Sequence, residues 1–396
     1  MCSLAVSCTY APDFDSRLRA ITKPHLFSIV KWEFGALLEE AGKAVSSGPI
    51  KVDDEASTVA GYFSAVGEIK KLKSEIGAIN AGGKLGDVAA LETELNELQG
   101  QNTNLAETVE RILEKQVREA LSQQGVFNPL YKYLRFKIPF PPLNFRLEGP
   151  PRLLVVSPRD KIESMREITL QQNINLEQIE SIEDRMDKLG ISPLVVALGG
   201  FAGTYPSFVT HEADLRFVLD AVAEEWLHQY LAFKPLGFRY LLDLTGIARD
   251  YEIATMNETV ASMAGKEIGT AVYDKYYAQN AETEAQAKTE KSGFDFDREM
   301  SDIRRAVDVY LAKGEIEQAE KFMEEKRQYL AANGYHIRKL NQAYFAFHGT
   351  YADRPASISP IGAELRELRR KSASLQEFLE TTASMSSRQD LKDSIK

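Results

Sequence analysis

The segment from Ala213 to Phe233 constrains the fold of this 396-residue chain most strongly. Its apolar residues recur three and four positions apart, which is the spacing of an α-helix, and they cover most of the helix surface. We therefore expect a buried helix in the centre of a domain. The same segment also contains Glu224, Glu225 and His228. Buried carboxylates are costly unless a partner or a metal ion compensates them, so these residues need a special environment.

The spacing of these three residues favours a metal site. On a helix, Glu224 and His228 lie one turn apart on the same face, and Glu225 is rotated from Glu224 by about 100°. In the pattern H-E-x-x-H, the first and last positions bind zinc and the second is a general base. Glutamate takes the first position here, and a carboxylate is an accepted zinc ligand. The pattern predicts Glu224 and His228 as metal ligands and Glu225 as a catalytic base.

A second predicted helix, from about Ile253 to Tyr277, contains Asn257 and Glu258. A degenerate H-E-x-x-H helix, a strand before it and a later helix with Asn-Glu together resemble the gluzincin, or thermolysin-like, zinc metallopeptidases. The matching region covers residues 190–275, at most a quarter of the chain. The third zinc ligand of that family is the glutamate of its Asn-Glu helix, so the resemblance implies that Glu258 completes the ligand set.

The resemblance implies a zinc-dependent peptidase with a zincin-like core. One zinc ion would be held by Glu224, His228 and Glu258, and Glu225 would be the general base. Glu224 stands where the family has histidine. Ser262 stands where the family has the aspartate that orients a histidine ligand.

Further side chains are needed around such ligands. A tyrosine or histidine can stabilise the oxyanion that develops during peptide hydrolysis, and a carboxylate can accept the second N–H of a histidine ligand. The candidates for these two roles are Tyr251, Glu267, Tyr344, His348 and Tyr351, with Asp243 and Asp250 as further carboxylates.

Residues 54–125 predict a coiled-coil helical hairpin. Apolar residues follow heptad-like spacing on both sides of the pair Gly82-Gly83, with Leu105 and the polar Asn102 at seam positions. An arm that projects from the protein and a bundle packed on the main domain both fit this pattern. The hairpin also supports an alternative function, a non-catalytic coiled-coil interaction or scaffold protein with a relic zincin-like domain.

The predicted fold class is α+β and mostly helical, with a small β-sheet beside the central motif helix. Proline-rich residues and two short extended runs, 143–147 and 152–156, predict a β-hairpin around the turn Gly149-Pro150-Pro151. The predicted divisions are a helical segment at 1–53 with a poorly structured start, the hairpin at 54–125, a metal-binding domain at 126–280, a helical region at 293–383 and a disordered tail at 384–396.

Composition restricts the partners. The net charge of −10 argues against nucleic acid as the main ligand, because phosphate contact needs a basic surface. Cys2 and Cys8 are both near the start and cannot staple a core. No apolar run has the length of a transmembrane helix. We expect a cytoplasmic protein that binds a peptide substrate, or a protein partner through the hairpin. If translation starts upstream of Met1, a membrane-anchored or exported protein is the alternative.

Overall fold

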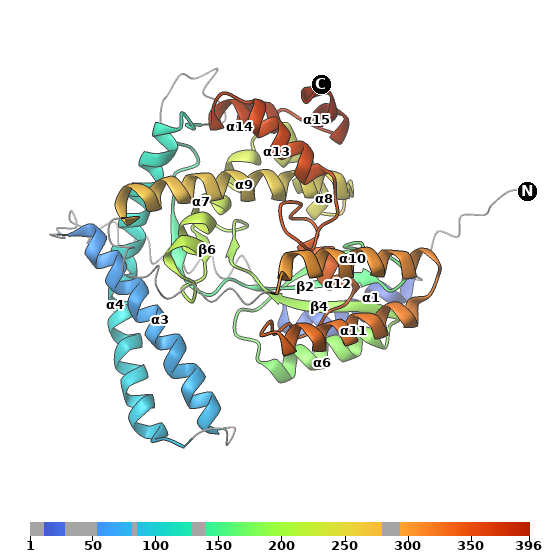
Figure 1. Cartoon of the computed structure of the whole chain (residues 1–396), viewed down its shortest axis with the longest axis horizontal. Helices are drawn as coiled ribbons and strands as arrows, with labels where there is room; N and C mark the ends of the chain where they lie inside the picture. Colours follow the sequence, from blue (N-terminus) through green and yellow to red (C-terminus); the bar gives the residue numbers. More distant parts are fainter. Residues whose placement is uncertain (1–11, 28–53, 81–84, 129–138, 279–293) are drawn as a thin grey trace, which may run out of the picture.

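The computed structural model describes residues 12–27, 54–80, 85–128, 139–278 and 294–396. The fold is α+β and mostly helical, as predicted, with two three-stranded sheets among the described residues. Three parts are visible in Figure 1: a helical body, a layered lobe built on a β-sheet, and a two-helix arm. In the described part of the chain, no helix combines the length and the apolarity needed to cross a membrane.

The layered lobe is built on an antiparallel sheet with strand order β3-β2-β4. Alternate residues of β2 face opposite sides of this sheet, as the pleat requires. Leu154 and Val156 pack in the core under α1 and α6, whereas Val155 packs against α12. The elements of this lobe are α1 (Pro12–Thr22), β2 (Arg152–Pro158), β3 (Arg166–Leu170), α6 (Leu176–Asp187), β4 (Ile191–Ala197), α10 (Phe296–Ala312), α11 (Ile316–Ala332) and α12 (Gln342–His348).

The helical body surrounds the motif helix, α7. Its elements are β1 (Phe145–Leu147), β5 (Gly200–Phe201), β6 (Ser207–Val209), α7 (Leu215–Leu231), α8 (Pro235–Leu244), α9 (Tyr251–Tyr276), α13 (Ile361–Lys371), α14 (Leu375–Ala383) and α15 (Arg388–Ser394). Helices α7 and α9 approach closely because α9 presents glycines to α7. A Cβ atom on Gly269 would overlap Asp220 Oδ1, and one on Gly265 would lie 3.0 Å from the Cβ of Glu224.

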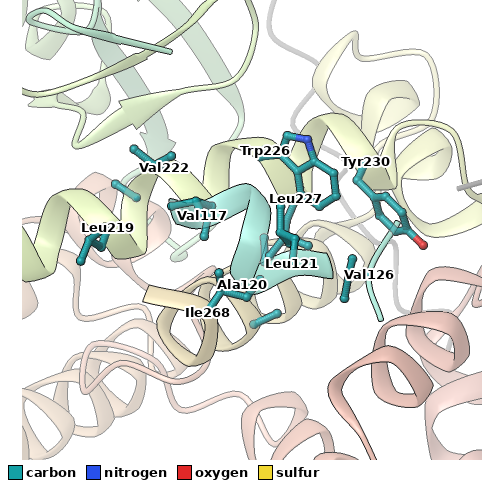
Figure 2. Close-up of a cluster of buried hydrophobic side chains, with 14 of the residues drawn as sticks. Val117, Ala120, Leu121, Val126, Leu219, Val222, Trp226, Leu227, Tyr230 and Ile268 are labelled. Carbon is teal, nitrogen blue, oxygen red and sulfur yellow. The ribbon is translucent and has the colours of Figure 1, made fainter. Parts of the chain in front are cut away.

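The arm consists of α3 (Glu55–Asn80) and α4 (Val88–Gln123), so the predicted helical hairpin is confirmed. Its base belongs to the core of the helical body, where α4 packs against α7 and α9 (Figure 2). The far half of the arm projects (Figure 1), and before Val109 the buried residue of α4 is the polar Asn102. Leu105, a predicted seam residue, is instead 39% exposed. The alternative of a bundle packed on the main domain therefore describes the base of the arm, and the alternative of a projecting arm describes its far half.

The predicted β-hairpin at residues 143–156 is wrong. Strand β1 pairs in parallel with β6, and β2 pairs with β3 and β4 in the other sheet. The two extended runs enter different sheets because each finds its apolar partners elsewhere. Strand β3 was not predicted.

Both predictions of disorder at the described chain ends are also corrected. Within residues 1–20, α1 begins at Pro12 and buries Phe14 and Leu18 against the β3-β2-β4 sheet. Within 384–396, α15 has a Ser387 capping box and buries Leu391 in the main core. A few buried apolar residues anchor each of these short helices. Most of the remaining helical segment predicted within residues 1–53 lies outside the described residues.

The packing does not follow the predicted divisions: residues 126–280 supply β2, β3, α6 and β4 to the layered lobe and α7 to α9 to the helical body. The region 293–383 also contributes to two parts: α12 packs on the β3-β2-β4 sheet and shares a core with α10 and α11, whereas α13 and α14 join α15 on the helical body. The chain segment between α12 and α13 crosses from one part to the other and passes α9. This crossing segment brings residues 349–354 to the predicted site.

Candidate metal centre

Helices α7 and α9 bring the three predicted ligands together. One ligand atom from each of Glu224, His228 and Glu258 lies within 4.8 Å of the other two. His228 Nε2 lies 3.6 Å from Glu258 Oε2. Glu224 and His228 are half-buried, and Glu258 is buried. Two carboxylates and an imidazole at these distances form a group that could hold a metal ion.

A hydrogen bond from Asn257 orients the histidine. Asn257 Oδ1 lies 2.9 Å from His228 Nδ1 and accepts its hydrogen. With Nδ1 protonated, Nε2 presents its lone pair toward Glu258, which is the tautomer that a metal ligand needs. Ser262, which stands where the gluzincins have an aspartate, donates to Asp353 at 3.3 Å.

A tyrosine from the neighbouring helix α8 orients Glu258. The hydroxyl of Tyr240 donates a hydrogen bond to Glu258 Oε1. The other oxygen, Oε2, is the one that faces His228. Burial, followed by the charge of Glu258, raises the pKa of Tyr240 well above its usual value. The phenol therefore stays protonated and remains a donor to this carboxylate.

Glu225 lies beneath the short edge strand β5. A Cβ atom on Gly200 would overlap Glu225 Oε1, so the glycine leaves the space that this carboxyl group fills. The adjoining turn is held on α7 by Gln229, whose Nε2 donates to the carbonyl oxygens of Ala202 at 3.3 Å and Thr204 at 3.0 Å. The predicted base is thus packed against a backbone segment of fixed position.

The carboxyl groups of the site are electrostatically unfavourable as a set. Burial raises the pKa of Glu224 to about 7, and His228 lowers it in part. Burial, then the charges of Glu224 and Glu258, raises the pKa of Glu225 well above its usual range. Burial also raises the pKa of Glu167 on β3, with a smaller contribution from Glu258. A cation among these groups would favour their charged forms, so the donor set fits a metal ion.

Of the predicted surrounding residues, the structure brings Tyr351 to the ligands. Burial, followed by the charges of Glu258 and Glu224, raises the pKa of the Tyr351 hydroxyl well above its usual value. Tyr344 and His348, which lie on α12 shortly before Tyr351 in the chain, are in ring contact with each other, with centroids 4.3 Å apart. We call these two rings and Tyr351 the aromatic corner.

The other predicted surrounding residues have different partners. Glu267 forms a two-pronged ion pair with Arg369, with N–O distances of 2.7 and 2.9 Å, so it does not support His228. The hydroxyl of Tyr251 lies near Gly349, and Tyr251 precedes Glu258 by about two helical turns. Asp250 caps α9 by accepting from the Ile253 backbone. Asp243 accepts from the backbone N–H of Asp250.

Three residues near the site were not predicted for the roles they have. Asn257 was predicted only as a neighbour of Glu258. Its side chain instead reaches His228 on α7. Tyr240 and Glu167 come from α8 and β3, and no spacing in the sequence connects either residue to the motif.

No family model matches this chain, and neither the curated proteins nor the solved structures include one that is similar to it.

Proposed function

We propose that this protein is a zinc-dependent peptidase. The observation that carries the proposal is the convergence of Glu224, His228 and Glu258 beside the buried carboxyl group of Glu225. Carboxylate and imidazole are both zinc ligands, and catalytic zinc sites commonly use three protein ligands and keep one position open. The gluzincin resemblance of the sequence supports the same reaction class.

The residues of the chain have separate tasks in this reaction. When bound, zinc would supply a Lewis acid that polarises a peptide carbonyl and makes water a stronger nucleophile. Glu225 accepts the proton of the attacking water and transfers it to the amine that leaves when the C–N bond breaks. The Tyr351 hydroxyl, kept protonated, donates a hydrogen bond to the oxyanion. Asn257 and Tyr240 keep His228 and Glu258 in place.

Metal analysis of the purified full-length protein tests the site. We expect one zinc ion per wild-type chain and loss of that ion in Glu258→Ala. The matched control is Glu267→Ala, the same change on the same helix, which should retain zinc. A zinc-free wild-type protein with full thermal stability would contradict the metal site, and the projecting arm would then be the leading functional surface.

Turnover is tested separately with Glu225→Gln. This variant should keep its zinc and lose peptide hydrolysis by about 10²–10⁴-fold, which is the usual contribution of a general base. The assay is release of new amino termini from a mixture of unrelated peptides by the zinc-loaded protein. Equal hydrolysis by wild type and Glu225→Gln would exclude Glu225 as the base.

A further inference from the structure

Arg354 is a half-buried cation beside the candidate metal centre. It lies in the segment that crosses from α12 to α13, three residues after Tyr351. Its guanidinium carbon is 4.3 Å from the centre of the Tyr351 ring, so the planar group stacks on a residue that is electrostatically coupled to Glu258 and Glu224. Burial raises the pKa of Glu224, and the positive charge of Arg354 offsets a small part of that rise.

The guanidinium of Arg354 lacks an anionic partner among the described residues, where no carboxylate forms an ion pair or a hydrogen bond with it. Many other arginines of the chain are paired, including Arg338 with Glu183 and Arg388 with Glu364. The N–H groups of this guanidinium therefore have no hydrogen-bonded carboxylate, and a guanidinium offers two parallel N–H donors that match one. The position of Arg354 therefore suits an anionic ligand.

The segment that carries Arg354 is held firmly on α9. Thr259 accepts from the backbone N–H of Ala352 at 2.9 Å and donates to the carbonyl of Thr350 at 3.3 Å. Asp353, next to the arginine, forms an ion pair with Lys266. Because Thr259 directly follows Glu258, the same helix positions a metal ligand and this segment. The arginine is therefore placed before any ligand arrives, which reduces the entropy lost on binding.

The rest of this corner is uncharged at neutral pH. Burial, followed by the charge of Arg354, lowers the pKa of His348 to about 4. Burial raises the pKa of Tyr344 to about 12. Arg354 is thus the charged group of the corner formed with these two rings and Tyr351.

We propose that Arg354 binds a carboxylate of the substrate next to the scissile bond, and that this carboxylate is the free C-terminus of a peptide. This inference rests on the proposed peptidase function and narrows it to an enzyme that removes residues from the C-terminal end. An acidic side chain offers the same chemistry, so the experiment separates the two sources.

The first measurement uses binding and needs no turnover. The probes are the monohydroxamates of succinic and glutaric acid and their methyl esters, titrated into zinc-loaded full-length protein by calorimetry. The hydroxamate is a general zinc-binding group, and the second carboxylate reports on Arg354. We expect at least one free acid to bind 10-fold or more tightly than its ester. Equal affinities for acid and ester with both probes would overturn the proposal.

Two variants assign this preference to Arg354. Arg354→Met should abolish the preference for the acid while keeping the affinity for the ester, which also reports an intact zinc site. Arg354→Lys should keep part of the preference, because the charge remains but the two-pronged geometry does not. The control is Arg305→Met on α10, whose side chain is 65% exposed. A preference that survives in Arg354→Met would contradict the assignment.

The second measurement compares three versions of one peptide: a free C-terminus, an amidated C-terminus, and an amidated C-terminus with an added internal glutamate. Mass spectrometry should find loss of C-terminal residues from the first version, with rates at least 10-fold lower for the amide. If the internal glutamate restores cleavage of the amidated peptide, Arg354 binds an acidic side chain and not the C-terminus. Equal cleavage of all three would reject the proposal while leaving the peptidase function standing. A preference for the acid probes without any cleavage would reject the peptidase function and keep the carboxylate site.

Discussion

The arm and the α7–α9 pair are both built from two packed helices, but they bury different chemistry. Helices α3 and α4 bury mainly apolar side chains, and the buried polar residues Glu110 and Gln116 of α4 accept hydrogen bonds from Leu147 N–H and the Tyr277 hydroxyl. Helices α7 and α9 bury Glu225, Asn257 and Glu258 in their apolar surroundings. The first arrangement stabilises a fold directly through apolar burial. The second is unfavourable for folding unless the polar groups have partners, and the proposed metal ion would be such a partner.

The glycines of the two pairs differ in the same way. A Cβ atom added to Gly61, Gly67 or Gly77 of α3 would meet nothing within 4 Å, whereas Gly265 and Gly269 of α9 touch α7. In the arm, glycine only loosens the helix. In α9, it permits the close approach that brings Glu224 to Glu258. Substitutions in the two regions should therefore have opposite consequences.

The largest expected effect is at Gly200. A methyl group there would overlap Oε1, Cδ and Cγ of Glu225, so this buried side chain would have to move as a whole. We expect Gly200→Ala to lower turnover by about 100-fold, since displacement of a catalytic group by about 1 Å has effects of this size. The zinc content and melting temperature should stay close to those of wild type. Unchanged turnover would mean that Glu225 does not act from its observed position.

The next effect is at Asn257. Its loss removes the acceptor for the His228 Nδ1–H, and partners of this kind typically contribute about 10–100-fold to metal affinity. Asn257→Ala should therefore bind zinc about 10–100-fold more weakly in a competition titration with a chelator. Asn257→Asp keeps an acceptor and should retain most of the affinity. If both variants bind zinc like wild type, the hydrogen bond has no role in the metal site.

Gly269→Ala tests the close crossing of α7 and α9. The added Cβ would lie 2.8 Å from the Asp220 backbone nitrogen, so the helices must separate. We expect a loss of about 1–3 kcal/mol in the free energy of unfolding, as for other overpacked sites, together with weaker zinc binding. Chemical denaturation gives the first quantity. Unchanged stability together with unchanged zinc binding would mean that the crossing is not tight in solution.

The pH dependence of stability tests the corner formed by His348. Its pKa is about 4 in the folded protein and about 6.5 in the unfolded chain. The unfolded chain therefore binds more protons between these values, and stability falls as the pH falls from about 6.5 to 4. The expected loss is at most about 2 kcal/mol between pH 7 and pH 5, because each pKa unit corresponds to about 1.4 kcal/mol. His348→Phe should flatten this part of the stability curve. A variant with the same slope as wild type would exclude His348 as its source.

The smallest effect belongs to the arm. Gly77→Ala places a methyl group in open space within a helix, so it should stabilise the protein by about 0.5–1 kcal/mol. Zinc content and turnover should not change, which makes this variant the counterpart of Gly269→Ala. A change in turnover would mean that the arm influences the site, which would contradict the distinction between the arm and the α7–α9 pair.

Local patterns in the sequence were sufficient to predict several elements. The periodicity of residues 213–233 predicts α7, and the heptad spacing predicts the arm. Spacing also predicted Glu224 and His228 as ligands, because they share one helix face, whereas Glu258 was predicted only through the resemblance to the gluzincins. The peptidase activity itself stays a prediction.

Tertiary structure decided the rest. The runs on either side of Gly149 look like one hairpin, yet each joins a different sheet. The surroundings of the ligands could not be predicted from the sequence either, since Tyr240 and Arg354 belong to separate parts of the chain. Helix periodicity is encoded among residues three and four positions apart, so the sequence by itself determined which residues share a helix face. Partners on other elements are selected by packing across the whole chain, and only the folded structure decides them.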